Sequence, residues 1–143
     1  MLVKQISVFL ENKEGRIARV TKALSDDSIN IRALSIADTT EFGILRIIVD
    51  NPTKAEKVLK KNGFTVSITE VIAIAIEDQP GGLARALDTL HTNEISVEYL
   101  YAFISKTSNK ANVILRVENC EKAIERLQKE NFTVLKASEV YDQ

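Results

Sequence analysis

The residues best suited to chemistry lie in two short glycine-containing segments, residues 11–16 and 77–82, each of which would join a strand to a helix. Pro80 suits a first helical turn, while Gly81 and Gly82 would let the backbone approach a ligand and expose N–H groups at the positive end of the helix dipole. That geometry suits a carboxylate, and Asp78 beside it offers an acceptor for an ammonium group. The segment therefore complements both ends of an α-amino acid. A tight turn with an aspartate cap is the alternative that needs no ligand.

Residues that could catalyse a reaction are few. His91 lies near a predicted helix end and fits an exposed histidine beside a cap better than a catalytic base. Cys120 lies near a helix N-terminus, a position that can lower a thiol pKa. Because Pro52 occupies the equivalent place in the repeat described below, we interpret Cys120 as a neutral residue at a helix start. None of the common hydrolase, zinc or nucleotide-binding motifs occurs. We expect no catalytic activity, no metal and no cofactor.

The overall composition is that of a packed globular protein, with 45% hydrophobic and 27% charged residues. Nineteen Lys and Arg against twenty Asp and Glu give a net charge of -1, which provides no field to hold nucleic acid. A single cysteine excludes an intrachain disulfide, and no apolar run has the length of a membrane span. With no signal-peptide pattern at the start, we expect a cytoplasmic protein without a membrane partner.

An internal repeat organises the chain. Residues 15–19 match residues 81–85 at a shift of 66, and residues 64–66 match 132–134 at a shift of 68. At the second shift Asn51 meets Asn119 and Leu59 meets Leu127. We therefore expect two domains of one kind, residues 1–69 and residues 70–143.

Both copies predict the same order of elements. Apolar residues spaced three, four and seven apart indicate helices that begin at Gly15 and at Pro80, and a second helix follows in each copy. Runs rich in β-branched residues indicate the strands. In copy one the strands are residues 5–10, 29–37, 44–49 and 64–68, and in copy two they are 71–76, 95–104, 112–117 and 132–135.

The order β-α-β-β-α-β is the ferredoxin-like arrangement of the α+β class, in which two helices cover one face of a four-stranded sheet. We expect the copies to join side by side into one eight-stranded antiparallel sheet. Val71, Ala73 and Ala75 alternate with isoleucines, so that strand is apolar on both faces and should be buried on both. This pattern favours a second layer from another subunit and hence a homodimer.

The chain resembles the ACT domain family of small amino-acid-binding regulatory modules, and most of all its stand-alone tandem members in prokaryotes. The resemblance covers nearly the whole chain twice and is carried by the Asp-x-Pro-Gly turn at Asp78 and by Ile29-Asn30-Ile31 before the second strand. In ACT pairs the ligand lies where the first turn of one domain meets the second strand of the other. The resemblance implies a site made by Asp78, Gln79, Gly81, Gly82 and Leu83 opposite Asn30 and Ile31.

A second, weaker site is implied at the reciprocal seam, although it departs from the family pattern. Glu14 stands where the proline is expected, and Ser96 replaces the asparagine. Tyr99 and Tyr101, two residues apart, should share one face of a strand and could line a pocket or pack between subunits. The residues of this second site are Asn12, Glu14, Gly15, Arg16, Ile17, Ser96 and Val97.

The resemblance implies an amino-acid sensor that acts on a separate regulated enzyme. Ile31 and Leu83 would bound the pocket without charge, so hydrophobic or aromatic amino acids are the expected ligands. Two alternatives remain: a structural dimerisation module without a ligand, and a small ferredoxin-like hydrolase of acylphosphatase type.

Overall fold

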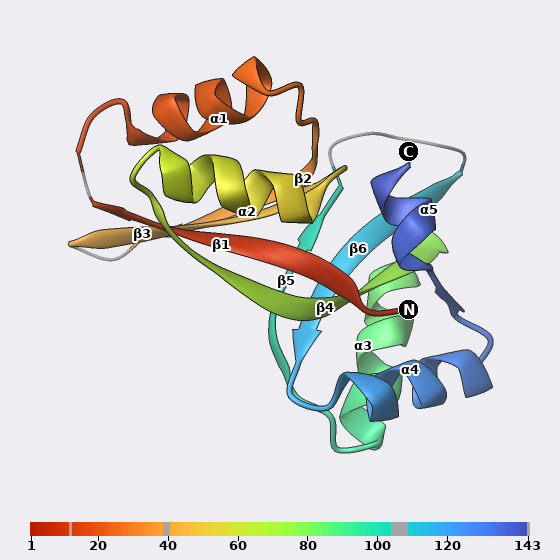
Figure 1. Cartoon of the computed structure of the whole chain (residues 1–143). Coiled ribbons are helices and arrows are strands. Elements are labelled where there is room, and N and C mark those ends of the chain that lie inside the picture. The colour runs from red at the N-terminus through yellow and green to blue at the C-terminus, as the bar shows by residue number, and fades with distance from the viewer. Residues whose placement is uncertain (12, 39–40, 104–108, 143) are drawn as a thin grey trace. The chain divides into compact units, whose positions relative to one another are not determined.

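A computed structural model describes residues 1–11, 13–38, 41–103 and 109–142 of the 143-residue chain. The βαββαβ order occurs twice, as expected, and the α+β class is confirmed (Figure 1). The elements are β1 (Val3–Glu11), α1 (Arg16–Asp26), β2 (Ile31–Asp38), β3 (Phe42–Val49), α2 (Pro52–Lys61), β4 (Thr65–Glu77), α3 (Gly82–Thr92), β5 (Val97–Ala102), β6 (Lys110–Val117), α4 (Cys120–Lys129), β7 (Thr133–Val134) and α5 (Ala137–Tyr141).

The described part of the chain has seven strands where eight were expected, because two predicted strands form the single strand β4. No glycine or proline stands between residues 65 and 77, so nothing in the sequence forces a turn there. The hydrogen-bonded order is β2-β3-β1-β4-β6-β5, with β7 also paired to β4. The pairs β1/β3, β2/β3, β4/β6, β4/β7 and β5/β6 are all antiparallel.

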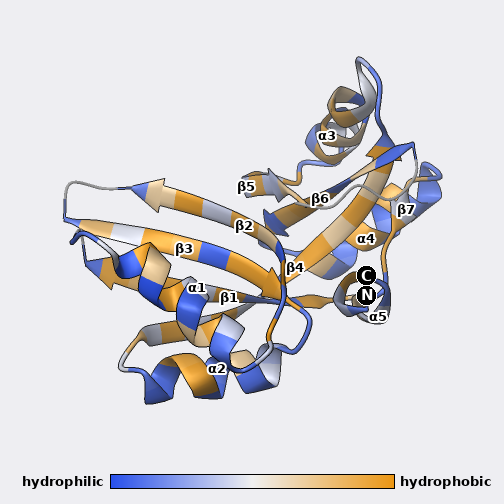
Figure 2. Cartoon of the chain, turned by 90° about the horizontal axis from the view of Figure 1, so that it is seen from above, coloured by the Kyte–Doolittle hydropathy of each residue, from blue (hydrophilic) through white to orange (hydrophobic). Residues whose placement is uncertain are grey.

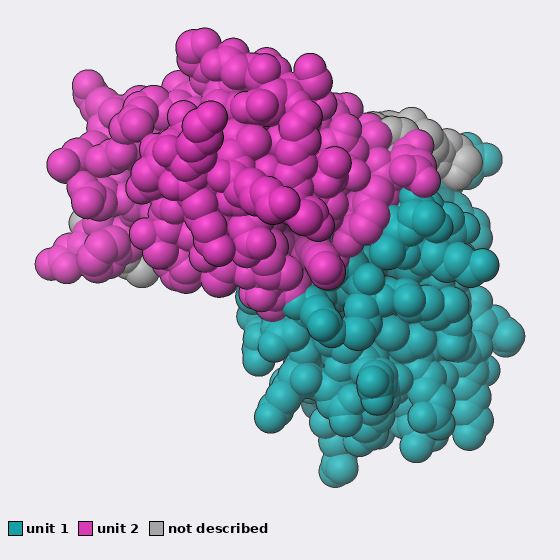
Figure 3. Space-filling model, in the orientation of Figure 1, with its two compact units in different colours: residues 1–3, 70–140 teal, residues 4–69, 141–143 magenta. Residues whose placement is uncertain are grey.

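The chain forms two compact units (Figure 3). Unit 2 contains Lys4–Thr69 and Tyr141–Gln143, and unit 1 contains Met1–Val3 and Glu70–Val140. Each unit therefore holds one βαββαβ copy together with a short segment from the far end of the chain. The N-terminal segment is anchored in unit 1, where the Gln128 side-chain amide lies 3.2 Å from the Met1 sulfur.

In unit 2, α1 and α2 lie on the same face of the strands (Figure 1). Side chains alternate between the two faces of a strand, and every second residue of β1 and β3 points toward these helices. In the strand register these residues are paired, with Ile6 opposite Ile47 and Val8 opposite Leu45. The packed core that results is apolar throughout and fully within unit 2. Its buried members are Ile6, Val8, Leu10, Val20, Leu24, Ile29, Leu45, Ile47, Val49, Ala55, Leu59 and Phe64.

Unit 1 repeats this arrangement with α3 and α4. In β4, Ile72 and Ile74 lie opposite Leu115 and Val113 of β6, and all four contribute to the buried core. Figure 2 shows this apolar stretch of β4 in orange. The helices add Ala86, Leu90, Ala123 and Leu127, and Leu2 packs against the same cluster from the N-terminal segment.

The other face of β4 contradicts one expectation. Val71 and Ala73 are fully buried within the single chain, and Ala75 is 9% exposed. Their apolar character therefore does not require a second subunit, because the chain itself already excludes water from them. The homodimer must rest on other observations.

Two other details at the ends of elements differ from the sequence prediction. Pro80 does not start α3, which begins at Gly82 with Gly81 as its N-cap. The last predicted strand shrinks to the two residues of β7 and is followed by the short helix α5, where the Lys136 N–H donates to the Glu139 carboxylate at 2.6 Å. No helix in the described ranges is long and apolar enough to cross a bilayer.

Candidate functional site

The turn between β4 and α3 is a tightly hydrogen-bonded segment of unit 1. The Gln79 N–H donates to the Glu77 carbonyl at 2.9 Å, and the Gly82 N–H donates to the Gln79 carbonyl at 3.0 Å. Gly81 has φ of 88° in the left-handed region, which disfavours residues that carry a Cβ atom. A main-chain reversal of this kind lets the strand lead directly into the first turn of α3.

Gly82 is required by close packing rather than by its dihedral angles. A Cβ atom at this position would overlap the Glu77 carbonyl oxygen. Gly82 is buried, and Leu83 next to it packs against the core of unit 1. The predicted site residues Gly82 and Leu83 thus fix the helix against the strand, whereas Gly81 shapes the turn.

The N-terminus of α3 has no side-chain cap, so an aspartate cap does not explain this turn. Asp78 is exposed, and its main-chain N–H donates to the Asn109 carbonyl at 3.3 Å. Gln79 is exposed as well. The first-turn N–H groups of a helix attract anions, and a carboxylate beside them can accept from a cation. The turn therefore presents both polarities within a few residues.

The equivalent turn of unit 2 has the same backbone shape but different charges. Gly15 is the left-handed N-cap of α1, with φ of 79°, and no side chain caps this helix either. Glu11 lies 3.1 Å from the Lys13 ammonium and 3.6 Å from the Arg16 guanidinium. The hydrogen bond and charge of Lys13, followed by the charge of Arg16, lower the Glu11 pKa.

The remaining residues expected at this second turn are less informative. Asn12 lies outside the described residues, Glu14 is exposed, and Ile17 is 45% exposed. Arg16 is already paired with Glu11, so this turn offers an ion pair where the other turn offers the exposed acidic side chain of Asp78. The two turns are chemically unequal, in agreement with their sequences.

The predicted second-strand residues lie just after α1 and α3. Asn30 and Asp50 are joined twice, since the Asn30 N–H donates to the Asp50 carboxylate and the Asp50 N–H donates to the Asn30 carbonyl, each at 3.1 Å. Asn30 and Ile31 line a shallow hollow of about 430 Å³ beside the end of α1. In unit 1, Ser96 is exposed and Val97, the first residue of β5, is half-buried.

Within one unit, the first turn and the start of the second strand lie at opposite ends of an 11-residue helix, a separation of roughly 16 Å at 1.5 Å per residue. Asp78 belongs to unit 1 and Asn30 to unit 2. The two halves of each expected site therefore come from different units, and their union into a pocket stays a prediction.

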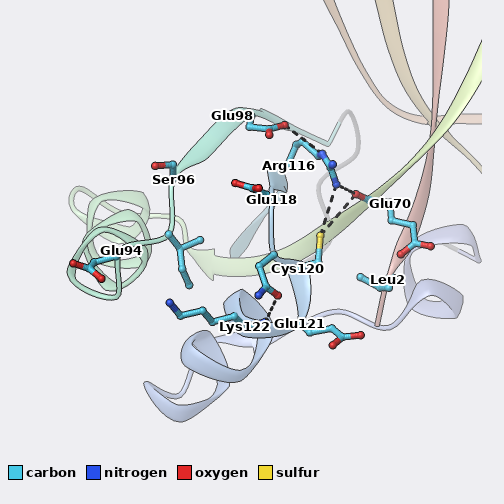
Figure 4. Close-up of a pocket in the computed structure, with 12 residues that line it drawn as sticks. Leu2, Glu70, Glu94, Ser96, Glu98, Arg116, Glu118, Cys120, Glu121 and Lys122 are labelled. Carbon is cyan, nitrogen blue, oxygen red and sulfur yellow. Dashed lines mark hydrogen bonds and ion pairs between the residues drawn. The ribbon is translucent and has the colours of Figure 1, made fainter.

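A larger pocket, absent from the sequence prediction except for Ser96, lies within unit 1 between the starts of β5 and α4. Its volume is about 660 Å³. Figure 4 shows Arg116 between the Glu98 carboxylate and the main chain of Glu70, with Cys120 next to it. The Arg116 guanidinium lies 3.3 Å from the Glu98 carboxylate and donates to the Glu70 carbonyl at 2.8 Å.

Cys120 is the first residue of α4, and burial raises the pKa of its thiol above the usual 9.0 despite the lowering effect of Arg116. The thiol is therefore neutral near pH 7, as we expected of a helix-start residue. His91, the last-turn histidine of α3, is exposed. The described residues contain no group of three or more His, Cys, Asp and Glu that could hold a metal ion.

Tyr99 and Tyr101 share one face of β5, as their spacing predicts. Their rings stack with centroids 6.5 Å apart and planes 17° apart. In the register with β6, Tyr99 lies opposite Arg116 and Tyr101 opposite Ile114. The pair thus lies on the sheet face away from the core of unit 1, which on β6 is built by Val113, Leu115 and Val117.

Known structures include a relative of high similarity. Protein BT0572 from Bacteroides thetaiotaomicron is 44% identical, with a TM-score of 0.93 over 100% of this chain and 98% of that one. A search of curated proteins gave no match.

More distant structures share the fold alone. The ligand-free regulatory subunit of aspartate kinase from Thermus thermophilus is 16% identical, with a TM-score of 0.66 over 90% of this chain and 93% of that one. Aspartate kinase from Synechocystis is 18% identical, with a TM-score of 0.58 over 95% of this chain and 28% of that one. The family model described as an ACT domain pair matches residues 1–142. The chain therefore belongs to the ACT domain family, as a pair of ACT domains in one polypeptide.

Proposed function

We propose that this ACT domain pair is an amino-acid-binding regulatory module without catalytic activity. The observation that carries the proposal is the β4–α3 turn, where an uncapped helix N-terminus stands beside the exposed Asp78. A free α-amino acid has the matching charges, with its carboxylate at the helix N-terminus and its ammonium group at Asp78. The family membership of the chain supports this choice of ligand.

The ligand would be held at the seam between the two domains. The Asp78 turn would face the start of β2, where Asn30 is exposed and Ile31 is half-buried. Leu83 and Ile31 would give the seam an apolar wall, which favours hydrophobic or aromatic amino acids over charged ones. The Gly15 turn with Ser96 and Val97 would form a weaker second site, because Glu11 already neutralises Arg16 there.

The module would act on a separate enzyme, in line with the aspartate kinase regulatory subunit that shares its fold. A homodimer is part of the proposal and rests on exposed apolar side chains of unit 2. Leu34 and Ile36 on β2, which ends the strand order, are 40% and 41% exposed and share one face of the strand. Light scattering at micromolar concentration should give twice the 15.9 kDa chain mass. A persistent monomer would contradict the proposed homodimer but not the proposed binding of an amino acid.

A thermal-shift screen of the twenty amino acids tests the central proposal. The protein should first be unfolded, dialysed and refolded, so that any ligand carried through purification is removed. An amino acid at about 100 times its dissociation constant should add roughly 2.7 kcal/mol to the free energy of unfolding. If no amino acid raises the melting temperature at millimolar concentration, the sensor function is wrong. A dimer with no ligand response would then favour the structural module, and turnover of acyl phosphates would favour the hydrolase.

A further inference from the structure

A pocket in unit 2 corresponds, through the repeat, to the large pocket of unit 1. It lies between the starts of β2 and α2 and has a volume of about 390 Å³. Arg32 and Lys54 line it together with Asp50, and so do Tyr141 and Asp142 from the far end of the chain. We call it the Arg32 pocket. All of these residues belong to unit 2.

Tyr141 is held in the Arg32 pocket by three hydrogen bonds. The Arg32 guanidinium donates to the Tyr141 carbonyl oxygen from Nε at 3.2 Å and from Nη2 at 2.9 Å. The Tyr141 hydroxyl accepts from the main-chain N–H of Lys4 at 2.8 Å. These contacts link three segments that are distant in sequence, and none of them uses a charge on Tyr141.

The Arg32 guanidinium binds a carbonyl oxygen, although its geometry suits a carboxylate better. Two of its N–H groups converge on a single neutral oxygen, whereas a guanidinium fork pairs best with the two oxygens of a carboxylate. In the same pocket the Lys54 ammonium donates to the Asp27 carbonyl at 2.8 Å, so among the described residues the partner of this second cation is also a neutral oxygen. Both cations could gain a stronger, charge-assisted partner from an anion.

The charge of the pocket depends on the segment that occupies it. Asp142 is part of that segment, and its carboxylate would leave with Tyr141. Arg32 and Lys54 would then face Asp50 alone, whose carboxylate already accepts the Asn30 N–H at 3.1 Å. Removal of the segment therefore both opens the pocket and makes it more cationic.

The repeat offers a comparison, because the equivalent pocket of unit 1 is lined by Leu2 from a distant segment rather than by Tyr141 and Asp142. At the position equivalent to Arg32, unit 1 has Glu98, which is paired with Arg116. The pocket there is larger, about 660 Å³ against 390 Å³. The difference is consistent with Tyr141 and Asp142 filling space in unit 2 that stays open in unit 1.

We propose that the Arg32 pocket is a binding site for a small carboxylate anion, and that Tyr141 and Asp142 act as a displaceable strap that occupies it. The Tyr141 carbonyl stands in for one oxygen of the anion. Tyr141 is the last residue of a helix of only five residues, and neither Tyr141 nor Asp142 belongs to the packed core of either unit. This site is separate from the Asp78 turn and does not depend on the function proposed for that turn.

The test follows the Arg32 Nε–H signal by ¹⁵N NMR in the full-length protein, during titration with sodium acetate at constant ionic strength set by sodium chloride. Tyr141→Ala removes the phenol that anchors the strap to Lys4, and Tyr141→Phe removes only the hydroxyl. Tyr141→Phe loses one neutral hydrogen bond and should lower the acetate midpoint about fivefold, whereas Tyr141→Ala also loses the packing of the ring and should lower it further. Glu98→Gln is the matched control at the repeat-equivalent position and should leave the midpoint unchanged.

A second readout guards against a variant that fails to fold. Amide hydrogen exchange of residues 137–142 in the unmodified protein should rise when acetate displaces the strap and should not rise with chloride. The proposal is overturned if acetate leaves the Arg32 signal unmoved, if chloride moves it equally, or if the midpoint is the same with and without the Tyr141 side chain. Faster exchange of residues 137–142 in Tyr141→Ala without any acetate response would likewise show a strap that guards no carboxylate site.

Discussion

The carbonyl oxygen of Glu77 occupies the space that a Cβ atom on Gly82 would need. The last residue of β4 and the first residue of α3 are thereby held closer together than any other residue type at position 82 would allow. This contact sets the entry angle of α3 and with it the position of the turn that contains Asp78. The glycine of the sequence motif is therefore first a requirement of packing.

Replacing Gly82 with alanine should lower the free energy of unfolding by about 3 kcal/mol, because the added methyl group must displace a backbone oxygen. Gly81→Ala is the matched control: it strains a left-handed residue but meets open space, and should cost about 1 to 2 kcal/mol. Urea denaturation of both variants gives the comparison. An equal or smaller loss for Gly82→Ala would show that the strand and helix can separate at little cost.

Replacing Asp78 with alanine should weaken amino-acid binding by roughly ten- to a hundredfold, since it removes a charge-assisted hydrogen bond of about 1.5 to 3 kcal/mol to the ligand ammonium. Stability should change little, because Asp78 is exposed and caps no helix. Isothermal titration calorimetry measures the affinity.

Two variants complete the experiment on the Asp78 turn. Gly81→Val should also block binding by crowding the N–H groups at the helix start, whereas Glu14→Ala in the other turn should have a smaller effect. If Asp78→Ala and Gly81→Val bind normally while Glu14→Ala does not bind, the true site is the turn of unit 2.

The helix caps of the two repeats should contribute equally to stability. The Asn51 side chain accepts from the Lys54 N–H at 3.1 Å, and the Asn119 side chain accepts from the Lys122 N–H at 3.0 Å. Asn51→Ala and Asn119→Ala should each cost about 1 kcal/mol, the usual value for loss of an N-cap. Asn62→Ala removes the C-cap of α2, whose side chain donates to the Val58 carbonyl at 2.8 Å, and so compares loss of a C-cap with loss of an N-cap. The free energy of unfolding is measured by chemical denaturation. If one of the two N-cap variants leaves it unchanged, the repeats differ in local order.

Cys120 should make the protein less stable at alkaline pH. Burial raises its pKa above 9.0, so the folded state favours the neutral thiol more than the unfolded state does. The resulting stabilisation is complete below pH 9 and is lost as the pH rises through the folded-state pKa. The free energy of unfolding of the unmodified protein should therefore fall toward that of Cys120→Ala as the pH rises above about 9.

The same thiol can be titrated directly, because the chain has a single cysteine. The rate of its reaction with a thiol reagent should have a higher pH midpoint in the folded protein than in urea. A lower midpoint in the folded protein would mean that Arg116 and the helix N-terminus outweigh burial.

The order of the elements could be predicted because the sequence contains it in two repeats, and both repeats independently indicate the same order. Apolar periodicity located the four longer helices and most strands. It could not locate α5, which is only five residues long, or recognise that residues 65–77 form one strand, because pattern alone does not show whether a chain turns.

The candidate site was predictable only in part. The Asp78 turn has a local signal, since proline and glycine fix its backbone. The pocket around Arg116 has none, because Glu70, Glu98 and Cys120 are brought together by tertiary contacts. The exchange of chain ends between the units is likewise invisible in the repeat, since Met1–Val3 and Tyr141 lie at its margins. One signal was available and unused: Asn51 and Asn119 match in the repeat, and both prove to be N-caps.

The placement of Tyr141 in unit 2 also constrains how the protein is made. Synthesis is vectorial, so Lys4–Thr69 emerges from the ribosome long before Tyr141 does. During that interval the N–H of Lys4 and the guanidinium of Arg32 have no Tyr141 to bind. Unit 2, whose strands are translated before those of unit 1, thus gains these hydrogen bonds only after Tyr141 has been made.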